Sequence, residues 1–199
     1  MSDQRLLTSY EEFSPEIVTE GIGEKKKLIL KGILQKSDTL NQNGRIYPRE
    51  ILEREVRNYQ KFIMENRALG ELDHPDASVI SMQKVSHIVR SAEMREDGTV
   101  YGTIEVLDTP CGKIVQTLVE SKVKVGISSR GVGSTKKQGD YHVVQPDYLI
   151  VCWDIVTDPS TPNAFMLPEG RKISKGDYDN VLTRSDRIYR IANELLNKR

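Results

Sequence analysis

The feature that most constrains the fold is a pair of apolar segments joined at Asp97-Gly98. Residues 85–94 and 99–107 have the composition of strands, and Asp-Gly between two such segments is a strong signal for a tight hairpin turn. Further strands are predicted before His74 and at the ranges 27–35, 122–128, 141–144 and 148–156. The sequence therefore predicts a mostly antiparallel arrangement of about six or seven strands.

Two helices are expected between these strands. Pro48 suits the first turn of a helix, and apolar side chains follow it at helical spacing from Ile51 to Ile63. Thr109-Pro110 predicts the cap and first turn of a second helix. The expected fold class is α+β: a mostly antiparallel β-barrel, or a strongly curled sheet, with surrounding helices.

Composition excludes several classes of protein. The 199 residues suit one domain with a substantial core, and 29 basic and 29 acidic residues cancel, so nothing indicates a general nucleic-acid or anionic-membrane surface. The longest apolar run, Tyr148–Trp153, is far too short to cross a membrane. Cys111 and Cys152 cannot form a disulfide framework and fit a reduced cytosolic compartment. No zinc-ligand spacing is present, so neither a metal nor a cofactor is expected.

The chain divides into three expected segments. Residues 1–25 are polar and weakly periodic, which predicts a poorly ordered N-terminal arm. Residues 26–168 contain the predicted strands and helices and form the expected folded domain. Residues 169–199 are charged and end in a predicted amphipathic helix, so we expect a C-terminal helical tail.

The most informative motif for function is Gly126-Ile127-Ser128-Ser129-Arg130-Gly131. A serine between glycines supplies an exposed hydroxyl, which becomes a nucleophile when an imidazole takes its proton and a third group orients that imidazole. Consecutive strand residues point to opposite faces, so only one of Ser128 and Ser129 can face a histidine. The residues alone do not choose between them, and Ser134 is a third candidate.

The possible bases are the three histidines: His74, His87 and His142. His87 lies inside a predicted strand, where a satisfied imidazole is the expected state, and His142 follows a turn and is expected to be exposed. Asp154 is the best candidate for the orienting acid, because it interrupts a run of large apolar residues. A carboxylate there needs a definite partner such as an imidazole N–H. Asp73 is less suitable, since its side chain points away from that of its neighbour His74.

Several blocks of sequence resemble the prohead core protease of T-even-type tailed phages, whose fold is similar to that of herpesvirus assemblin. The resemblance runs from about residue 30 to about residue 168. The blocks that carry it are Asn41-Gln42-Asn43-Gly44-Arg45-Ile46-Tyr47-Pro48, Ala68-Leu69-Gly70-Glu71-Leu72-Asp73-His74-Pro75, Val100-Tyr101-Gly102, Gly126-Ile127-Ser128-Ser129-Arg130-Gly131-Val132-Gly133-Ser134 and Asp154-Ile155-Val156 followed by Pro159-Ser160.

The resemblance implies a herpesvirus-protease-like barrel in residues 26–168 and a Ser-His-Asp triad of Ser128, His74 and Asp154. Because the assemblin family uses a Ser-His-His arrangement, His87 and His142 remain possible third members. The implied activity is that of a serine endopeptidase that cleaves scaffold, core and capsid proteins inside the assembling prohead, in the cytoplasm of the host bacterium. Such enzymes cut after glutamate in the pattern aliphatic-any-Glu, and they are made as precursors that process themselves.

Two finer assignments accompany this function. The oxyanion of the reaction intermediate is expected to meet the backbone N–H groups of a loop containing Arg130, Gly131 and Gly133. The loop lacks the ending and helix of a phosphate-binding P-loop. A substrate glutamate needs a basic pocket, for which Arg130 and Arg45 are candidates.

The tail contains a match to the implied cleavage pattern. Leu167-Pro168-Glu169-Gly170 predicts self-cleavage between Glu169 and Gly170, which would release residues 170–199 from the precursor. Self-association is possible. The alternative function is a non-catalytic barrel that serves as a scaffold or tube component of a phage particle. An esterase or amidase is disfavoured, because the Gly-x-Ser-x-Gly strand-turn-helix context is missing.

Overall fold

The structure is a computed structural model that describes residues 5–11, 18–20, 27–73, 78–123 and 125–156. The chain's contacts divide it into two units, Met1–Pro168 and Glu169–Arg199, and all described residues belong to the first. His74, Glu169 and Gly170 therefore lie outside the described residues, as does the predicted C-terminal helix.

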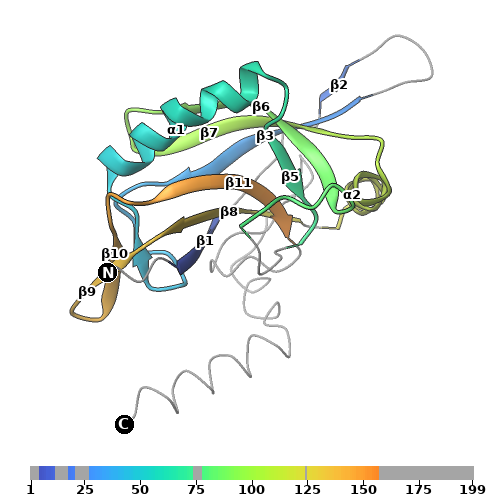
Figure 1. The fold of residues 1–199 in the computed structure, drawn as a ribbon. Helices are drawn as coiled ribbons and strands as arrows, with labels where there is room; N and C mark the ends of the chain where they lie inside the picture. Colours follow the sequence, from blue (N-terminus) through green and yellow to red (C-terminus); the bar gives the residue numbers. More distant parts are fainter. Residues whose placement is uncertain (1–4, 12–17, 21–26, 74–77, 124, 157–199) are drawn as a thin grey trace, which may run out of the picture. The chain divides into compact units, whose positions relative to one another are not determined.

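The described part of the chain forms three sheets and two helices (Figure 1). The sheets have the strand orders β2-β3-β7-β6-β5, β1-β8-β11 and β4-β10-β9. All pairings are antiparallel except that of β4 with β10. The bounds are β1 (Arg5–Glu11), β2 (Val18–Glu20), β3 (Lys27–Lys36), β4 (Arg45–Ile46), α1 (Arg49–Met64), β5 (Leu69–Glu71), β6 (Val85–Met94), β7 (Thr99–Val106), α2 (Pro110–Glu120), β8 (Gly126–Gly133), β9 (Thr135–Gln138), β10 (Tyr141–Val144) and β11 (Leu149–Val156).

The predicted hairpin and both helices are confirmed. β6 and β7 pair antiparallel around the turn, where Gly98 has a φ of 82° that favours glycine. Pro48 is the N-cap residue of α1. The Thr109 side chain accepts a hydrogen bond from the backbone N–H of Gly112, which caps α2 at the predicted position.

Two sequence predictions about strands need correction. The serine motif was expected at the end of a strand over residues 122–128, but β8 begins at Gly126 and continues to Gly133. In the predicted N-terminal arm, Arg5–Glu11 and Val18–Glu20 are strands. β1 acquires its conformation by pairing along its full length with β8, a long-range interaction that local periodicity does not reveal.

The predicted closed barrel is not confirmed. Among the described residues, the sheet containing β8 is joined to the five-stranded sheet by a single parallel bridge, Leu72↔Ile155, next to the end of β5. No other strand pairing among these residues joins the β1-β8-β11 sheet to the five-stranded sheet. The described fold is therefore a mixed α/β arrangement dominated by antiparallel strands.

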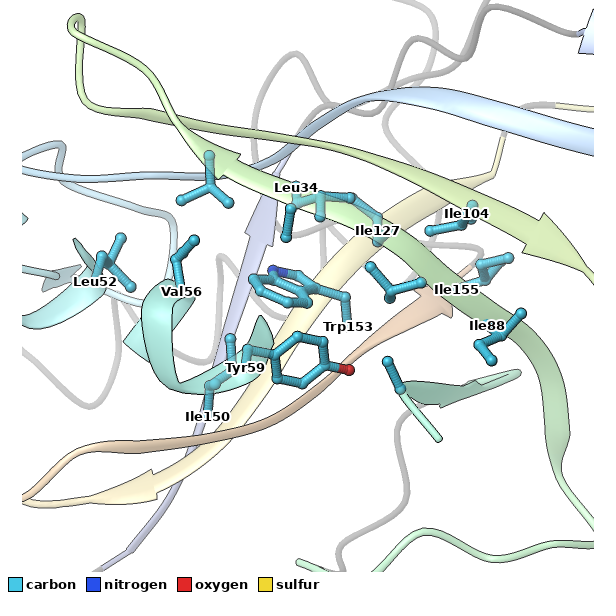
Figure 2. Close-up of a cluster of buried hydrophobic side chains, with 14 of the residues drawn as sticks. Leu34, Leu52, Val56, Tyr59, Ile88, Ile104, Ile127, Ile150, Trp153 and Ile155 are labelled. Carbon is cyan, nitrogen blue, oxygen red and sulfur yellow. The ribbon is translucent and has the colours of Figure 1, made fainter. Parts of the chain in front are cut away.

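The core lies between α1, the five-stranded sheet and the β1-β8-β11 sheet. Trp153 of β11 has no exposed surface, and its ring makes an edge contact with Tyr59 of α1 at a centroid distance of 4.8 Å. Figure 2 shows Trp153 among apolar side chains from α1, β3 and β8, including Val56, Leu34 and Ile127. This packing fixes which face of β11 points into the core, and so which face carries its polar residues.

Candidate active site

The serine motif lies in the middle strand of its sheet, with β1 on one side and β11 on the other (Figure 1). Ser128 is paired with Asp154 across the β8–β11 ladder, and Ser129 is paired with Trp153. Directly opposite residues of an antiparallel pair have their side chains on the same face. Ser128 and Asp154 therefore share one face of the sheet, whereas Ser129 lies on the face that carries the core residue Trp153.

A β-bulge creates this alignment. The ladder pairs Gly131 with Ile150 but Arg130 with Cys152, so Val151 is an extra residue in β11. Without it, every residue of β11 beyond Ile150 would move to the opposite face relative to β8. Buried Glu55 of α1 accepts a hydrogen bond from the Ile150 N–H at 3.0 Å. Helix α1 thus contacts the backbone next to the irregularity that brings Asp154 opposite Ser128.

Asp154 is held by a buried ion pair. Its Oδ2 lies 2.8 Å from Arg130 Nε, and its Oδ1 lies 3.1 Å from Arg130 Nη2. Oδ1 also accepts hydrogen bonds from the Glu71 N–H at 3.0 Å and from the Cys152 thiol at 3.1 Å. Burial and the Asp154 charge raise the pKa of the Cys152 thiol well above its ordinary value, so that it stays protonated and can donate.

Glu71 extends the network towards the residue before His74. Its Oε2 lies 3.2 Å from Arg130 Nη2, and its Oε1 accepts a hydrogen bond from the Ser81 N–H. Two residues on, the Asp73 N–H donates to the carbonyl of Ile155 at 2.8 Å. The structure thus brings together Ser128, Asp154 and the chain that leads directly to position 74, while His74 itself lies outside the described residues.

The two other histidines occupy different environments. His87 in β6 is fully buried, and its Nε2 lies 2.9 Å from the Trp153 carbonyl and its Nδ1 lies 2.9 Å from Ser86 Oγ. Burial lowers the pKa of His87 to about 4, although Asp154 acts in the opposite direction. His142 lies in β10 and is paired with Arg45 of β4 and Lys137 of β9. These three strands form a sheet that does not contain β8.

Gly70 provides the space that the His87 contact needs. A Cβ at this position would collide with the imidazole of His87 and with the carbonyl of Trp153. The glycine therefore allows β5 to lie close against β6 and β11, next to the residue that pairs with Arg130.

The predicted oxyanion loop is wrong as a description of local structure, because Arg130, Gly131 and Gly133 all lie within β8. A strand paired on both edges directs successive N–H groups to its two neighbours, here β1 and β11. The glycines have a packing reason as well: a Cβ on Gly131 would lie 2.6 Å from the Leu149 carbonyl oxygen. The assignment of these N–H groups to an oxyanion stays a prediction.

The guanidinium of Arg130 is fully buried and already paired with two carboxylates, so it is not presented to a substrate. Sequence reasoning missed this role and that of Glu71. A signal was present, since positions 128 and 130 of one strand share a face, and an arginine there can pair with an acid that interrupts a buried strand.

Comparisons with known proteins show the family to which the chain belongs. The model of a family described as prohead core protein serine protease matches residues 11–176. The chain therefore belongs to that family of serine proteases. It is similar to the prohead core protein protease of Enterobacteria phage T4, with 30% identity over 183 residues, which cover 89% of this chain and 84% of that protein.

A solved structure of the bacteriophage T4 capsid assembly protease, gp21, is also similar. The TM-score is 0.72 with 26% sequence identity, over 79% of this chain and 99% of the T4 chain. Together these comparisons identify a phage protease of capsid maturation. Among the described residues, no helix has the length and apolar character needed to span a membrane.

Proposed function

We propose that the chain is a serine endopeptidase in which Ser128 is the nucleophile, His74 the general base and Asp154 the acid that orients it. The observation that carries this proposal is the pairing of Ser128 with Asp154 across the ladder, on the face opposite to Trp153. An imidazole from the chain that follows Asp73 would take the Ser128 proton as the hydroxyl attacks a peptide carbonyl. It would then return that proton to the leaving amine.

The choice of Ser128 over Ser129 rests on the same register. Ser129 is paired with Trp153 and lies on the core face, away from Asp154. His87 is a weak candidate for the third member, because both of its ring nitrogens already have close partners within β6 and β11. His142 belongs to another sheet.

The substrates we propose are the scaffold, core and capsid proteins of an assembling prohead, in the cytoplasm of the infected bacterium. The names of the T4 relatives support a role in capsid assembly. We further propose cleavage after glutamate in the pattern aliphatic-any-Glu. Of the two basic residues considered for the glutamate pocket, Arg45 of β4 is the better candidate, because the Arg130 guanidinium is buried against Asp154.

Self-processing is part of the proposal. Ser128 and Asp154 have no exposed surface in the structure, so a substrate or a probe reaches them when the site opens, as it must in a chain that processes itself. This burial supports a precursor form. Cleavage between Glu169 and Gly170, both outside the described residues, would separate residues 170–199 from the remainder of the chain.

The test is labelling of the purified chain with a fluorophosphonate probe, followed by peptide mapping. We expect the label on Ser128, loss of labelling in Ser128→Ala and retained labelling in Ser129→Ala, the matched control on the opposite face. Intact mass then compares the active chain with Ser128→Ala, and we expect a fragment beginning at Gly170 only from the active chain. Absence of any labelled serine in the folded wild-type chain would contradict the proposal and favour a non-catalytic scaffold component.

A further inference from the structure

A single buried guanidinium connects the three strands around the proposed triad. Arg130 belongs to β8, two residues after Ser128, and contacts Asp154 of β11 and Glu71 of β5. All three side chains have no exposed surface. Charges without solvent persist only when they are paired and hydrogen-bonded, so these side chains depend on one another.

Both oxygens of Asp154 are engaged by this arrangement. Arg130 approaches Oδ2 with Nε and Oδ1 with Nη2, which is a two-point contact of the kind that fixes the plane of a carboxylate. Burial lowers the pKa of Arg130, but its hydrogen bonds to the Cys152 sulfur and to the Asp154 carboxylate, together with the Asp154 charge, produce a net rise. Arg130 therefore keeps its charge and holds the Asp154 carboxylate in one orientation.

Glu71 fixes the other side of the network. Its backbone N–H donates to Asp154, and its carboxylate contacts Arg130 and the N–H of Ser81. The next residue, Leu72, donates its N–H to the Lys84 carbonyl at 3.0 Å. The short segment that ends at Asp73 is thus tied to β11 and to the start of β6 immediately before position 74.

We propose that Arg130 and Glu71 are positioning residues of the peptidase centre: Arg130 orients Asp154 against the serine strand, and Glu71 ties the same guanidinium to the segment that presents His74. The inference rests on the proposed function. Neither residue touches the substrate. They act by holding Asp154 and the segment that ends at Asp73 in one geometry relative to Ser128, and misplacement of catalytic groups by about 1 Å can cost roughly 100-fold in rate.

The signs of the two charges distinguish this role from a general structural one. Removing the cation of Arg130 should make it easier to protonate an imidazole that acts together with Asp154, as the proposed function requires of His74, so the acid limb of the pH–rate profile should move to higher pH. Removing the anion of Glu71 makes that protonation harder, so the limb should move to lower pH. General loosening of the fold gives no reason for opposite shifts.

The experiment measures the second-order rate constant for inactivation by a fluorophosphonate, as a function of pH. The variants are Arg130→Met, Glu71→Gln, the double variant and Arg130→Lys. The control is Arg90→Met, which removes the partly exposed ion pair of Arg90 with Glu105 at 2.7 Å on the β6–β7 hairpin. Thermal unfolding of each variant is recorded in parallel.

We expect Arg130→Met to react roughly 100-fold more slowly than the wild-type chain. The acid limb should move up in Arg130→Met, down in Glu71→Gln and to an intermediate position in the double variant. Arg130→Lys should recover only part of the rate, because an ammonium cannot match the planar fork of a guanidinium. The Arg90→Met control should react at the wild-type rate.

Folded variants that react at the wild-type rate would overturn the inference, and so would acid limbs that move in the same direction. If Arg130→Met does not fold, the nearly isosteric Glu71→Gln and the charge-retaining Arg130→Lys decide the question by the same criteria. A wild-type chain that is not labelled at all would instead contradict the proposed function, so the two failures are distinguishable.

Discussion

Burial of His87 should make the protein acid-labile over a defined range of pH. The pKa of His87 is lowered to about 4 by burial, whereas an unfolded histidine titrates near 6.5. The folded state thus binds this proton more weakly than the unfolded state. Its contribution to stability is complete above about pH 6.5 and is lost as the pH falls towards about 4. The full loss is roughly 3 kcal/mol, from the difference between about 4 and about 6.5 at about 1.4 kcal/mol per pKa unit.

The assay is urea unfolding of the wild-type chain and of His87→Gln at about pH 7.5 and about pH 5. Between these two values the His87 linkage should cost the wild-type chain about 2 kcal/mol of unfolding free energy. His87→Gln should be less stable at neutral pH, because it loses the ring that bonds Ser86 and the Trp153 carbonyl. However, its stability should fall by about 2 kcal/mol less than that of the wild-type chain on acidification.

His142→Gln is the matched control, because this residue lies in β10 and is only partly buried. It should keep the wild-type dependence on pH. A His87→Gln chain with an unchanged dependence would refute the reasoning, since the titrating group would then lie elsewhere. It would also reopen the question of whether His87 is charged in the folded protein and available as a third triad member.

Three further predictions concern the site. Asp154→Asn should lower fluorophosphonate reactivity by roughly 10⁴-fold, by analogy with the loss of the orienting acid in a serine protease triad. It should also lower the melting temperature, because Arg130 loses one of its two carboxylate partners. Glu55→Gln should destabilise the chain by about 1–3 kcal/mol in urea unfolding, since it weakens a buried carboxylate network at the bulge. Gly131→Ala should destabilise it by about 1–3 kcal/mol, because the added Cβ would crowd β11, and an unchanged urea midpoint would show that β8 and β11 adapt.

Much of the fold could be predicted from local sequence. The β6–β7 hairpin, α1 and the Thr109 cap of α2 each depend on residues close together in the chain, and each is confirmed. β1 and the second half of β8 were missed for a common reason. Their conformation comes from pairing with each other over a long sequence separation, and a polar segment such as Arg5–Glu11 carries little intrinsic preference for a strand.

The candidate site was accessible to sequence reasoning only in part. That an aspartate within an apolar strand needs a partner follows from the cost of burying a charge, and Asp154 does have one among the described residues, the Arg130 guanidinium. Strand alternation makes Arg130 a possible partner, but the sequence alone does not select it. The choice of partner depends on the register of β8 against β11, which a single extra residue changes by one position.

The bulge at Val151 therefore links the packing of the core to the chemistry of the site. Trp153 must face α1 and Tyr59 for the core to close, and its neighbours Cys152 and Asp154 must then face the other way. Because of the extra residue Val151, the face of β11 that carries Asp154 lies on the same side of the sheet as Ser128. Glu55 of α1 accepts a hydrogen bond from the Ile150 N–H at the bulge. Helix α1 thus supplies apolar partners of Trp153, such as Tyr59, and also supports the register that aligns Asp154 with Ser128. In this protein the alignment of acid and serine is therefore a property of how β11 packs against the core.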